Sequence, residues 1–260
     1  MAHPERDILD GLEAIQFGTG SVYYPNFLKN LGIDADELFL FMMEDQFIDR
    51  GEDFMKYRGN KLARSKKFWM KCRLATGALI YGYPGFQYES VLRYLCYKDV
   101  PHLDKLVALF GKLGFEYNHI IGTKYETGSD NIGFHSDKTD SWEPNSSVAI
   151  LSLGATREFQ FMKITEDPQE SDLLRLWFTH GSCCIISWED NLANKHSIPP
   201  VEYCELRVSL CFRNIKHFIS KAKLDQKIRA SQKSREERKL KKQRRIESSS
   251  AEITPTIVSI

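Results

Sequence analysis

The sequence predicts an α+β protein in which a region with helices precedes an all-β sandwich, barrel or jelly roll. Between residues 115 and 215, short apolar segments alternate with turns rich in Gly, Pro, Asn and Asp. That spacing is typical of antiparallel sheets and argues against a parallel α/β sheet. Residues 1–114 hold the clearest helical patterns, and 42% hydrophobic residues among 260 are ample for a buried core.

The N-terminal region is expected to combine helices with irregular segments. Residues 1–20 predict a short helical leader, and VYYPNFL predicts a strand that enters a turn. Asp34–Glu37 resembles a capping box that opens a helix. A second helix is expected over residues 100–113, while residues 57–90, rich in Gly, Tyr, Lys and Arg, predict irregular surface segments.

The β region is expected to contain five main strands, each bounded by turn residues. They are FEYNHIIGTKY, VAILSLG, REFQFMKI, GSCCIISW and ELRVSLCF.

The composition argues against a membrane protein and against a disulfide-stabilised one. No stretch approaches the roughly 18 apolar residues that span a bilayer, and the start, MAHPERDILDGLEAIQ, is charged where a signal peptide is apolar. We therefore expect an intracellular protein. The six cysteines show no CxxC spacing and are expected to be buried free thiols.

The net charge of +1 hides a strong asymmetry. Residues 216–246 contain thirteen Lys or Arg and only three acids, so this segment carries +10 and the remainder of the chain −9. Clustered Lys and Arg bind phosphates by releasing counterions. The segment is therefore interpreted as a nucleic-acid contact, as an import signal at KLKKQRR, or as an ordinary solvated tail.

His135 and Asp137, in the stretch FHSDKTDSW, are the first candidates for a metal site. Side chains alternate across a strand, so these two point to the same face while Ser136 points away. One imidazole and one carboxylate on one face can share an ion. The HxD motif alone is a weak signal, because a structural hydrogen bond explains it equally well.

Of the seven histidines, His196 is the best candidate for a third ligand. It lies in NKHSIPP, after the apolar strand CCIISW and before a turn enforced by proline. Two histidines and one carboxylate form the facial triad of non-haem Fe(II) oxygenases, but a zinc hydrolase uses the same ligand types. The three ligands alone do not decide between the two metals.

The stretch RVSLCFR favours the oxygenase. Alternation places Arg207, Ser209, Cys211 and Arg213 on one face of a strand. Inward-facing arginines require an anionic partner, and the guanidinium fork suits a carboxylate. A dicarboxylate co-substrate supplies that partner, whereas a solvated strand face with surface salt bridges is the alternative.

Taken together, these motifs resemble the AlkB family of Fe(II)- and 2-oxoglutarate-dependent dioxygenases. The resemblance runs from about VYYPNFL to FRNI, and the ordered set of motifs is more specific than any one of them. The motifs are YETGSDNIGFHSD, SSVAILSLGATREFQF, HSIP and RVSLCFR.

The resemblance implies a double-stranded β-helix with a helical N-terminal extension. The chain then divides into a leader (1–20), an N-terminal extension with a substrate lid (21–114), the catalytic β-helix core (115–215) and a basic, partly helical or disordered tail (216–260). The lid includes YGYPGFQY.

The resemblance also implies cofactors, site residues and a reaction. The cofactors are Fe(II), 2-oxoglutarate and O2, and the reaction oxidises an N-methyl group, which leaves as formaldehyde while 2-oxoglutarate becomes succinate and CO2. The iron ligands it implies are His135, Asp137 and His196. The residues it assigns to 2-oxoglutarate are Arg207, Arg213, Tyr125 and, at a position commonly occupied by Asn, Thr123.

The substrate residues are less clearly marked. Tyr81 occupies the position of the family's base-contacting aromatic residue and is the stacking candidate. Base-repair members often carry an acid two positions after the metal aspartate. Here that residue is Thr139, and the acid, Asp140, comes one position later.

The predicted function is therefore a dioxygenase that demethylates alkylated bases in DNA or RNA. We expect an intracellular monomer without membrane contact, located in the nucleus if the host is eukaryotic. Two alternatives stay open. One is an oxygenase on the same fold that acts on protein or lipid, which Thr139 leaves open; the other is a non-catalytic module that binds nucleic acid or protein through its tail.

Overall fold

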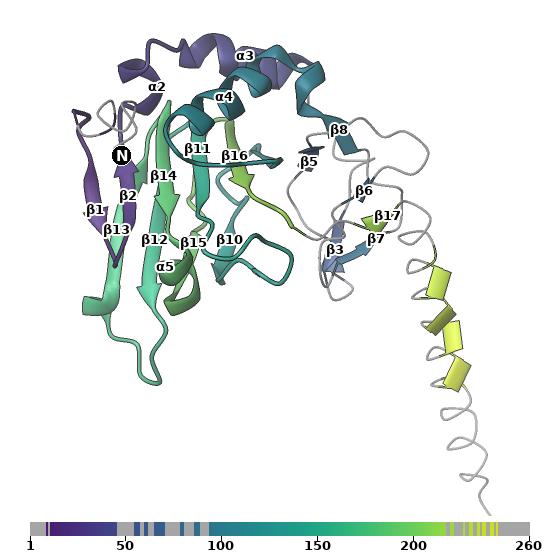
Figure 1. Cartoon of the computed structure of the whole chain (residues 1–260). Helices are drawn as coiled ribbons and strands as arrows, with labels where there is room; N and C mark the ends of the chain where they lie inside the picture. Colours follow the sequence, from purple (N-terminus) through teal and green to yellow (C-terminus); the bar gives the residue numbers. More distant parts are fainter. Residues whose placement is uncertain are drawn as a thin grey trace, which may run out of the picture.

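Two β-sheets face each other, and helices cover the outer face of the larger sheet (Figure 1). The computed structural model describes residues 9, 11–45 and 94–216, the strands between residues 55 and 88, residues 219–220 and scattered helical positions between 226 and 243.

The larger sheet has eight strands in the order β1-β2-β14-β11-β16-β9-β5-β8. Neighbouring strands are antiparallel except for β5 and β8, which are parallel. The strands are β1 (Ile15–Phe17), β2 (Ser21–Tyr24), β5 (Ser65–Met70), β8 (Tyr94–Cys96), β9 (His119–Tyr125), β11 (Val148–Gly154), β14 (Ser182–Ile186) and β16 (Arg207–Arg213).

The smaller sheet has four antiparallel strands in the order β10-β15-β12-β13. Its strands are β10 (Ile132–His135), β12 (Arg157–Lys163), β13 (Leu173–Phe178) and β15 (Asn194–Ile198). From β9 to β16 the chain crosses repeatedly between the two sheets, as in a double-stranded β-helix. The predicted fold class is confirmed, and the five expected main strands correspond to β9, β11, β12, β14 and β16.

Side-chain alternation divides the core into two layers. Val148 and Ile150 of β11 face the smaller sheet and pack in one cluster with its Phe159. Ala149 and Leu151 face the other way and pack with the helices. A strand buried on both faces is nearly continuously apolar, which is why VAILSLG lacks a polar alternation.

Three helices cover the larger sheet: α2 (Phe27–Asn30), α3 (Ala35–Asp45) and α4 (Pro101–Lys112). As predicted, α3 begins where the Asp34 Oδ1 atom accepts a hydrogen bond of 3.0 Å from the Glu37 amide. Phe110 of α4 is fully buried, with its ring centroid 4.9 Å from that of Phe212 on β16. This helix therefore supports the strand whose opposite face carries the arginines.

Two predictions for the N-terminal region were wrong. Residues 15–17, expected in a helical leader, form β1 because β2 offers its edge for antiparallel pairing. Residues 57–90, expected to be irregular, contain β5, which pairs with β9 along six residues and buries Trp69 completely. Local composition did not reveal that β9 lacked a partner on this side.

The chain also contains short elements that the sequence did not suggest. Helix α5 (Trp188–Ala193) links β14 to β15, and single 3-10 turns are η1 (Tyr97–Asp99) and η2 (Glu170–Asp172). Two small sheets are formed by β3 (Met55–Tyr57), β4 (Asn60–Lys61) and β7 (Phe86–Tyr88), and by β6 (Leu79–Ile80) and β17 (Ile219–Ser220).

In the part of the chain that the structure describes, the prediction of buried free thiols is confirmed for three of five cysteines. Cys96, Cys183 and Cys184 are buried, Cys204 and Cys211 are partly buried, and all five are free thiols. None of the helices within the described ranges is long and apolar enough to cross a membrane.

Candidate metal and co-substrate site

The pairing of β10 with β15 brings two predicted metal ligands together. His135 and His196 are direct register partners, and their ring centroids lie 4.4 Å apart. Asp137 follows two residues after His135, beyond the end of β10. One donor atom from each of the three residues lies within 4.8 Å of the others, a spacing that fits a shared metal ion.

The carboxylate of Asp137 is ionised in this setting. Burial raises the pKa of Asp137, but the charges of Arg213, His196 and His135 outweigh burial and lower the pKa to about 2. Arg213 also donates a hydrogen bond from Nη2 to Asp137 Oδ1 at 2.6 Å. A negative, oriented ligand is therefore present at neutral pH.

Each of the two histidines can offer a nitrogen lone pair to a metal ion. Burial, followed by the charge of His135, lowers the pKa of His196 to about 3, so its ring is neutral at physiological pH. His135 Nδ1 lies 3.0 Å from the Gly133 carbonyl; donation of its proton there leaves Nε2 with the lone pair. Among the described residues, His196 Nδ1 is buried without a hydrogen-bond partner. The donor set and this unpartnered nitrogen fit a divalent metal such as Fe(II).

Arg207 lines the same cavity as the three candidate metal ligands. It is 1% exposed, its Nε donates to Ser152 Oγ at 3.0 Å, and its guanidinium lies 4.8 Å from the centroid of the Tyr125 ring. Within the described structure, its Nη1 is buried without a partner. A buried guanidinium with an unused donor fits a carboxylate of a bound anion.

The strand β16 delivers both arginines to the cavity. Residues 207, 209, 211 and 213 all line it, as alternation along RVSLCFR predicts. Thr123 and Tyr125 reach it from β9, where they are the register partners of Ser209 and Arg207. The remaining walls are apolar; they are Ile121, Ile132, Ile150, Phe159, Phe178 and Ile198.

The two substrate candidates, unlike the metal and co-substrate candidates, are not among the described residues that line the cavity. Asp140 is exposed and does not line the cavity. Tyr81 lies outside the described residues. Two other histidines have partners elsewhere, since His102 contacts Glu37 at 3.1 Å and His180 Nδ1 accepts from the Gly154 amide.

Sequence reasoning missed two residues that support the site. Arg157 is 1% exposed, and its Nη2 donates to the carbonyl groups of Asp130 and Pro199 at 2.9 and 2.6 Å. It thereby fixes the loop that joins β9 to β10. Asn191 bonds the backbone of Asp137 from α5. No local motif marks either residue, because their partners are carbonyl and amide groups far away in the sequence.

Comparison with known families decides the class of this site. The sequence model of the 2OG-Fe(II) oxygenase superfamily matches residues 20–246. The chain belongs to this superfamily. Membership implies Fe(II), 2-oxoglutarate and O2 as cofactors, in agreement with the His-Asp-His cluster.

Individual relatives point to the AlkB branch of the superfamily. Human DNA oxidative demethylase ALKBH2 is 28% identical over 193 residues, which cover 71% of this chain and 74% of that protein. The mouse protein of the same name is 27% identical over 197 residues, 72% of this chain and 82% of that protein. Human alpha-ketoglutarate-dependent dioxygenase alkB homolog 3 is 27% identical over 108 residues, 39% and 38% of the two chains.

A solved structure supports the fold. The structure of OsALKBH1 matches with a TM-score of 0.50 and 16% identity, covering 77% of this chain and 100% of that chain. The oxygenase is thus an AlkB-like enzyme, and the resemblance seen in the sequence motifs is confirmed.

Proposed function

We propose that this oxygenase demethylates N-alkylated bases in nucleic acid, with iron held by His135, Asp137 and His196. The observation that carries the metal assignment is the convergence of three donor atoms within 4.8 Å on β10, its C-terminal extension and β15. Bound Fe(II), together with 2-oxoglutarate and O2, supplies the oxidising chemistry. The chain supplies the ligands, their orientation and a partly apolar cavity that limits access of water.

The two arginines are proposed to orient 2-oxoglutarate along β16. Arg213 contacts Asp137 and so lies at the metal end, whereas Arg207 lies six residues away at the other end of the strand. Arg207 is therefore proposed to hold the distal carboxylate through its unused Nη1, and Tyr125 to add a hydrogen bond. Thr123 occupies the position where family members commonly carry Asn, so one hydrogen bond to 2-oxoglutarate is proposed to be shortened or lost.

An alkylated base is the proposed substrate. The names of the relatives support it, since ALKBH2 is a DNA oxidative demethylase and covers most of this chain. A base within a duplex cannot reach a buried metal, so the enzyme takes single strands or flips the nucleotide, at a cost of a few kcal/mol. Tyr81 is proposed to stack on the base, and Asp140, being exposed, to make a polar contact with the flanking nucleic acid.

The basic segment 216–246 is proposed to bind phosphates. Its charge of +10 offsets the −9 of the remainder, which by itself repels nucleic acid. The division of the chain at residues 20, 114 and 215 is retained as a proposal, with one refinement: β17 pairs with β6, so the separable basic tail begins after Ser220. If the host is eukaryotic, KLKKQRR also directs the monomeric protein to the nucleus.

The reaction is tested by following both products. Iron-loaded protein is mixed anaerobically with 2-oxoglutarate and an oligonucleotide containing 1-methyladenine or 3-methylcytosine, O2 is admitted, and succinate and formaldehyde are measured. We expect formaldehyde only with the methylated oligonucleotide, and neither product from His135→Ala or Asp137→Ala.

Matched controls separate the alternatives. The unmethylated oligonucleotide measures turnover of 2-oxoglutarate without demethylation. A methylated peptide tests the protein oxygenase that Thr139 leaves open. Formaldehyde from the peptide alone would contradict a nucleic-acid substrate. Normal turnover by the metal-ligand variants would contradict the site, and absence of both products from folded, iron-loaded protein would favour a binding module.

A further inference from the structure

We propose that Asn191 is a positioning residue for the metal site, because its side chain holds the backbone of Asp137 in place. This inference rests on the proposed function, since it concerns the same His135–Asp137–His196 site. It adds a residue that is not a ligand and that lies on a different element, α5.

Asp137 needs such support because no strand in the described part of the chain pairs with it. Strand β10 ends at His135, and its pairing with β15 is already irregular between Ile132 and His135. Asp137 therefore follows the ladder instead of belonging to it. A ligand on an unpaired backbone has freedom that a metal site must remove.

The side chain of Asn191 replaces the missing ladder partner. Its Oδ1 accepts a hydrogen bond of 2.9 Å from the Asp137 amide, and its Nδ2 donates one of 2.9 Å to the Asp137 carbonyl. A carboxamide presents one acceptor and donors side by side, like the backbone of a neighbouring strand residue. Of the twenty side chains, only Asn and Gln carry both groups in this arrangement.

Burial makes this pair of hydrogen bonds effective. Asn191 is 1% exposed and Asp137 is 8% exposed, so water competes little for either backbone group. If the carboxamide is removed, an amide and a carbonyl are left without their partner beside the metal ligand, and the backbone must move to find another. The Asp137 carboxylate moves with it.

Helix α5 links this contact to the third ligand. The Asn191 amide donates to the Ser187 carbonyl at 3.0 Å, which keeps Asn191 within the first turns of the helix. The chain then passes directly into β15, where His196 is the third residue. One rigid element thereby sets the position of Asp137 through a side chain and that of His196 through the main chain.

The same helix end offers a matched control. Asn194 is also buried, at 9% exposure, and its Nδ2 donates a hydrogen bond of 2.9 Å to the carbonyl of Asp190. Both residues are buried asparagines that bond an aspartate carbonyl at the same distance; Asn191 lies in α5, and Asn194 follows α5 directly as the first residue of β15. Only Asn191 bonds the aspartate that is a proposed metal ligand.

The test measures metal binding without turnover. The full chain and the variants Asn191→Ala and Asn194→Ala are titrated with Co(II) alone, by calorimetry and by visible absorption. We expect Asn191→Ala to raise the Kd for Co(II) by roughly 10- to 100-fold, the range for loss of an outer partner of a ligand, and to change the Co(II) spectrum. Asn194→Ala should keep both Kd and spectrum while lowering Tm by a similar amount.

The outcomes distinguish this inference from the metal site itself. Wild-type affinity in folded Asn191→Ala, or an equal loss in Asn194→Ala, overturns the positioning role. His135→Ala serves as the reference for the site: if it binds Co(II) like wild type, the proposed function fails as well. Should Asn191→Ala not fold, Asn191→Ser takes its place, because the shorter serine side chain cannot bridge the Asp137 amide and carbonyl, and an unchanged Kd in that variant also overturns the role.

Discussion

Arg207 shows how much a single side chain depends on its surroundings. Its guanidinium is held on one side by Ser152 Oγ and by the Tyr125 ring, which leaves Nη1 for the proposed contact with the co-substrate. Burial lowers the pKa of Arg207, but arginine stays protonated in proteins. The residue is therefore a fixed cation with a fixed orientation.

Replacement of Arg207 by lysine tests that orientation. Lysine keeps the charge but loses the planar fork, and hydrogen bonds to charged groups are worth about 1.5–3 kcal/mol each. We expect Arg207→Lys to raise KM for 2-oxoglutarate roughly 10- to 100-fold in succinate formation, with kcat largely kept at saturation. Arg175→Lys, at an exposed arginine on β13, is the control; an equal KM for both variants would contradict the assignment.

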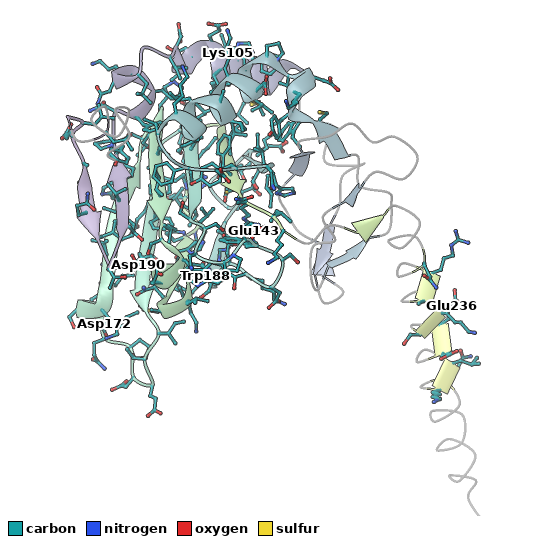
Figure 2. The ribbon with its side chains drawn as sticks, in the orientation of Figure 1. Lys105, Glu143, Asp172, Trp188, Asp190 and Glu236 are labelled. Carbon is teal, nitrogen blue, oxygen red and sulfur yellow. The ribbon has the colours of Figure 1, made fainter. Side chains whose placement is uncertain are left out.

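At the scale of elements, α5 is fixed to the β1–β2 turn by one carboxylate. Asp190, 1% exposed, accepts hydrogen bonds from the Thr19 amide and hydroxyl, the Gly20 amide and the Ser21 hydroxyl, the last at 2.6 Å. Figure 2 labels Asp190 and Trp188 on this helix. The clamp keeps α5, and with it Asn191, in place against the larger sheet.

The clamp predicts a pH-dependent stability. Burial raises the pKa of Asp190, but the hydrogen bonds from Ser21, Thr19 and Ser187 outweigh it, and the folded pKa lies below the ordinary 3.8. The stabilisation is therefore present above that value and is lost as pH falls through the folded pKa. We expect Asp190→Asn to lower the free energy of unfolding at pH 7 by about 1–3 kcal/mol. Urea denaturation should show a difference from wild type that shrinks below pH 3.8; a constant difference would contradict the mechanism.

The same clamp makes Gly18 less tolerant of substitution than Gly32, a second glycine with positive φ. Gly18 (φ 61°) and Gly32 (φ 67°) share a left-handed conformation, but a Cβ at Gly18 collides with the Asp190 carboxylate, while at Gly32 nothing lies within 4 Å. Gly32→Ala should cost about 1–2 kcal/mol from conformation alone, and Gly18→Ala more. Equal losses in thermal or urea unfolding would show that the carboxylate moves freely.

At the scale of the whole molecule, charge separates into an acidic body and a basic tail. The described positions after residue 226, including Glu236, are exposed and lie outside the two packed sheets (Figure 1, Figure 2). We propose that a segment with this charge binds phosphates at a distance from the metal site. This proposal assigns affinity and catalysis to different parts of the chain.

Truncation after Ser220 tests whether the basic tail contributes affinity but not catalysis. The truncated chain keeps β17, which pairs with β6. We expect weaker oligonucleotide binding and a shallower dependence on salt, because each lost phosphate contact removes about 0.7–0.9 from the log–log slope. Fluorescence anisotropy at several salt concentrations measures both. Succinate formation without oligonucleotide should be unchanged.

A variant that makes the tail more positive should have the opposite effect on nucleic-acid binding. Glu236→Gln with Glu237→Gln, both exposed, should tighten binding and steepen the salt dependence without any change in length. If truncation and this double variant leave affinity unaltered, the tail does not contact nucleic acid.

The sequence by itself determined the main strands of the β region and the chemistry of the ligands. Strand periodicity identified the main strands, alternation put Arg207 and Arg213 on one face, and ligand types with their order identified the family. These properties are local or depend on residue identity, so a sequence carries them directly.

Only the tertiary structure decided how the site is held. Strand β5 joins the larger sheet because β9 has a free edge on that side. His196 and His135, 61 positions apart in the sequence, become neighbours because β10 and β15 pair in that register. Asn191 bonds the backbone of Asp137, which lies beyond the end of β10. Arg157 likewise bonds a backbone carbonyl, that of Asp130. Partnerships between backbone groups distant along the chain leave no pattern in the side chains, so packing alone determines them.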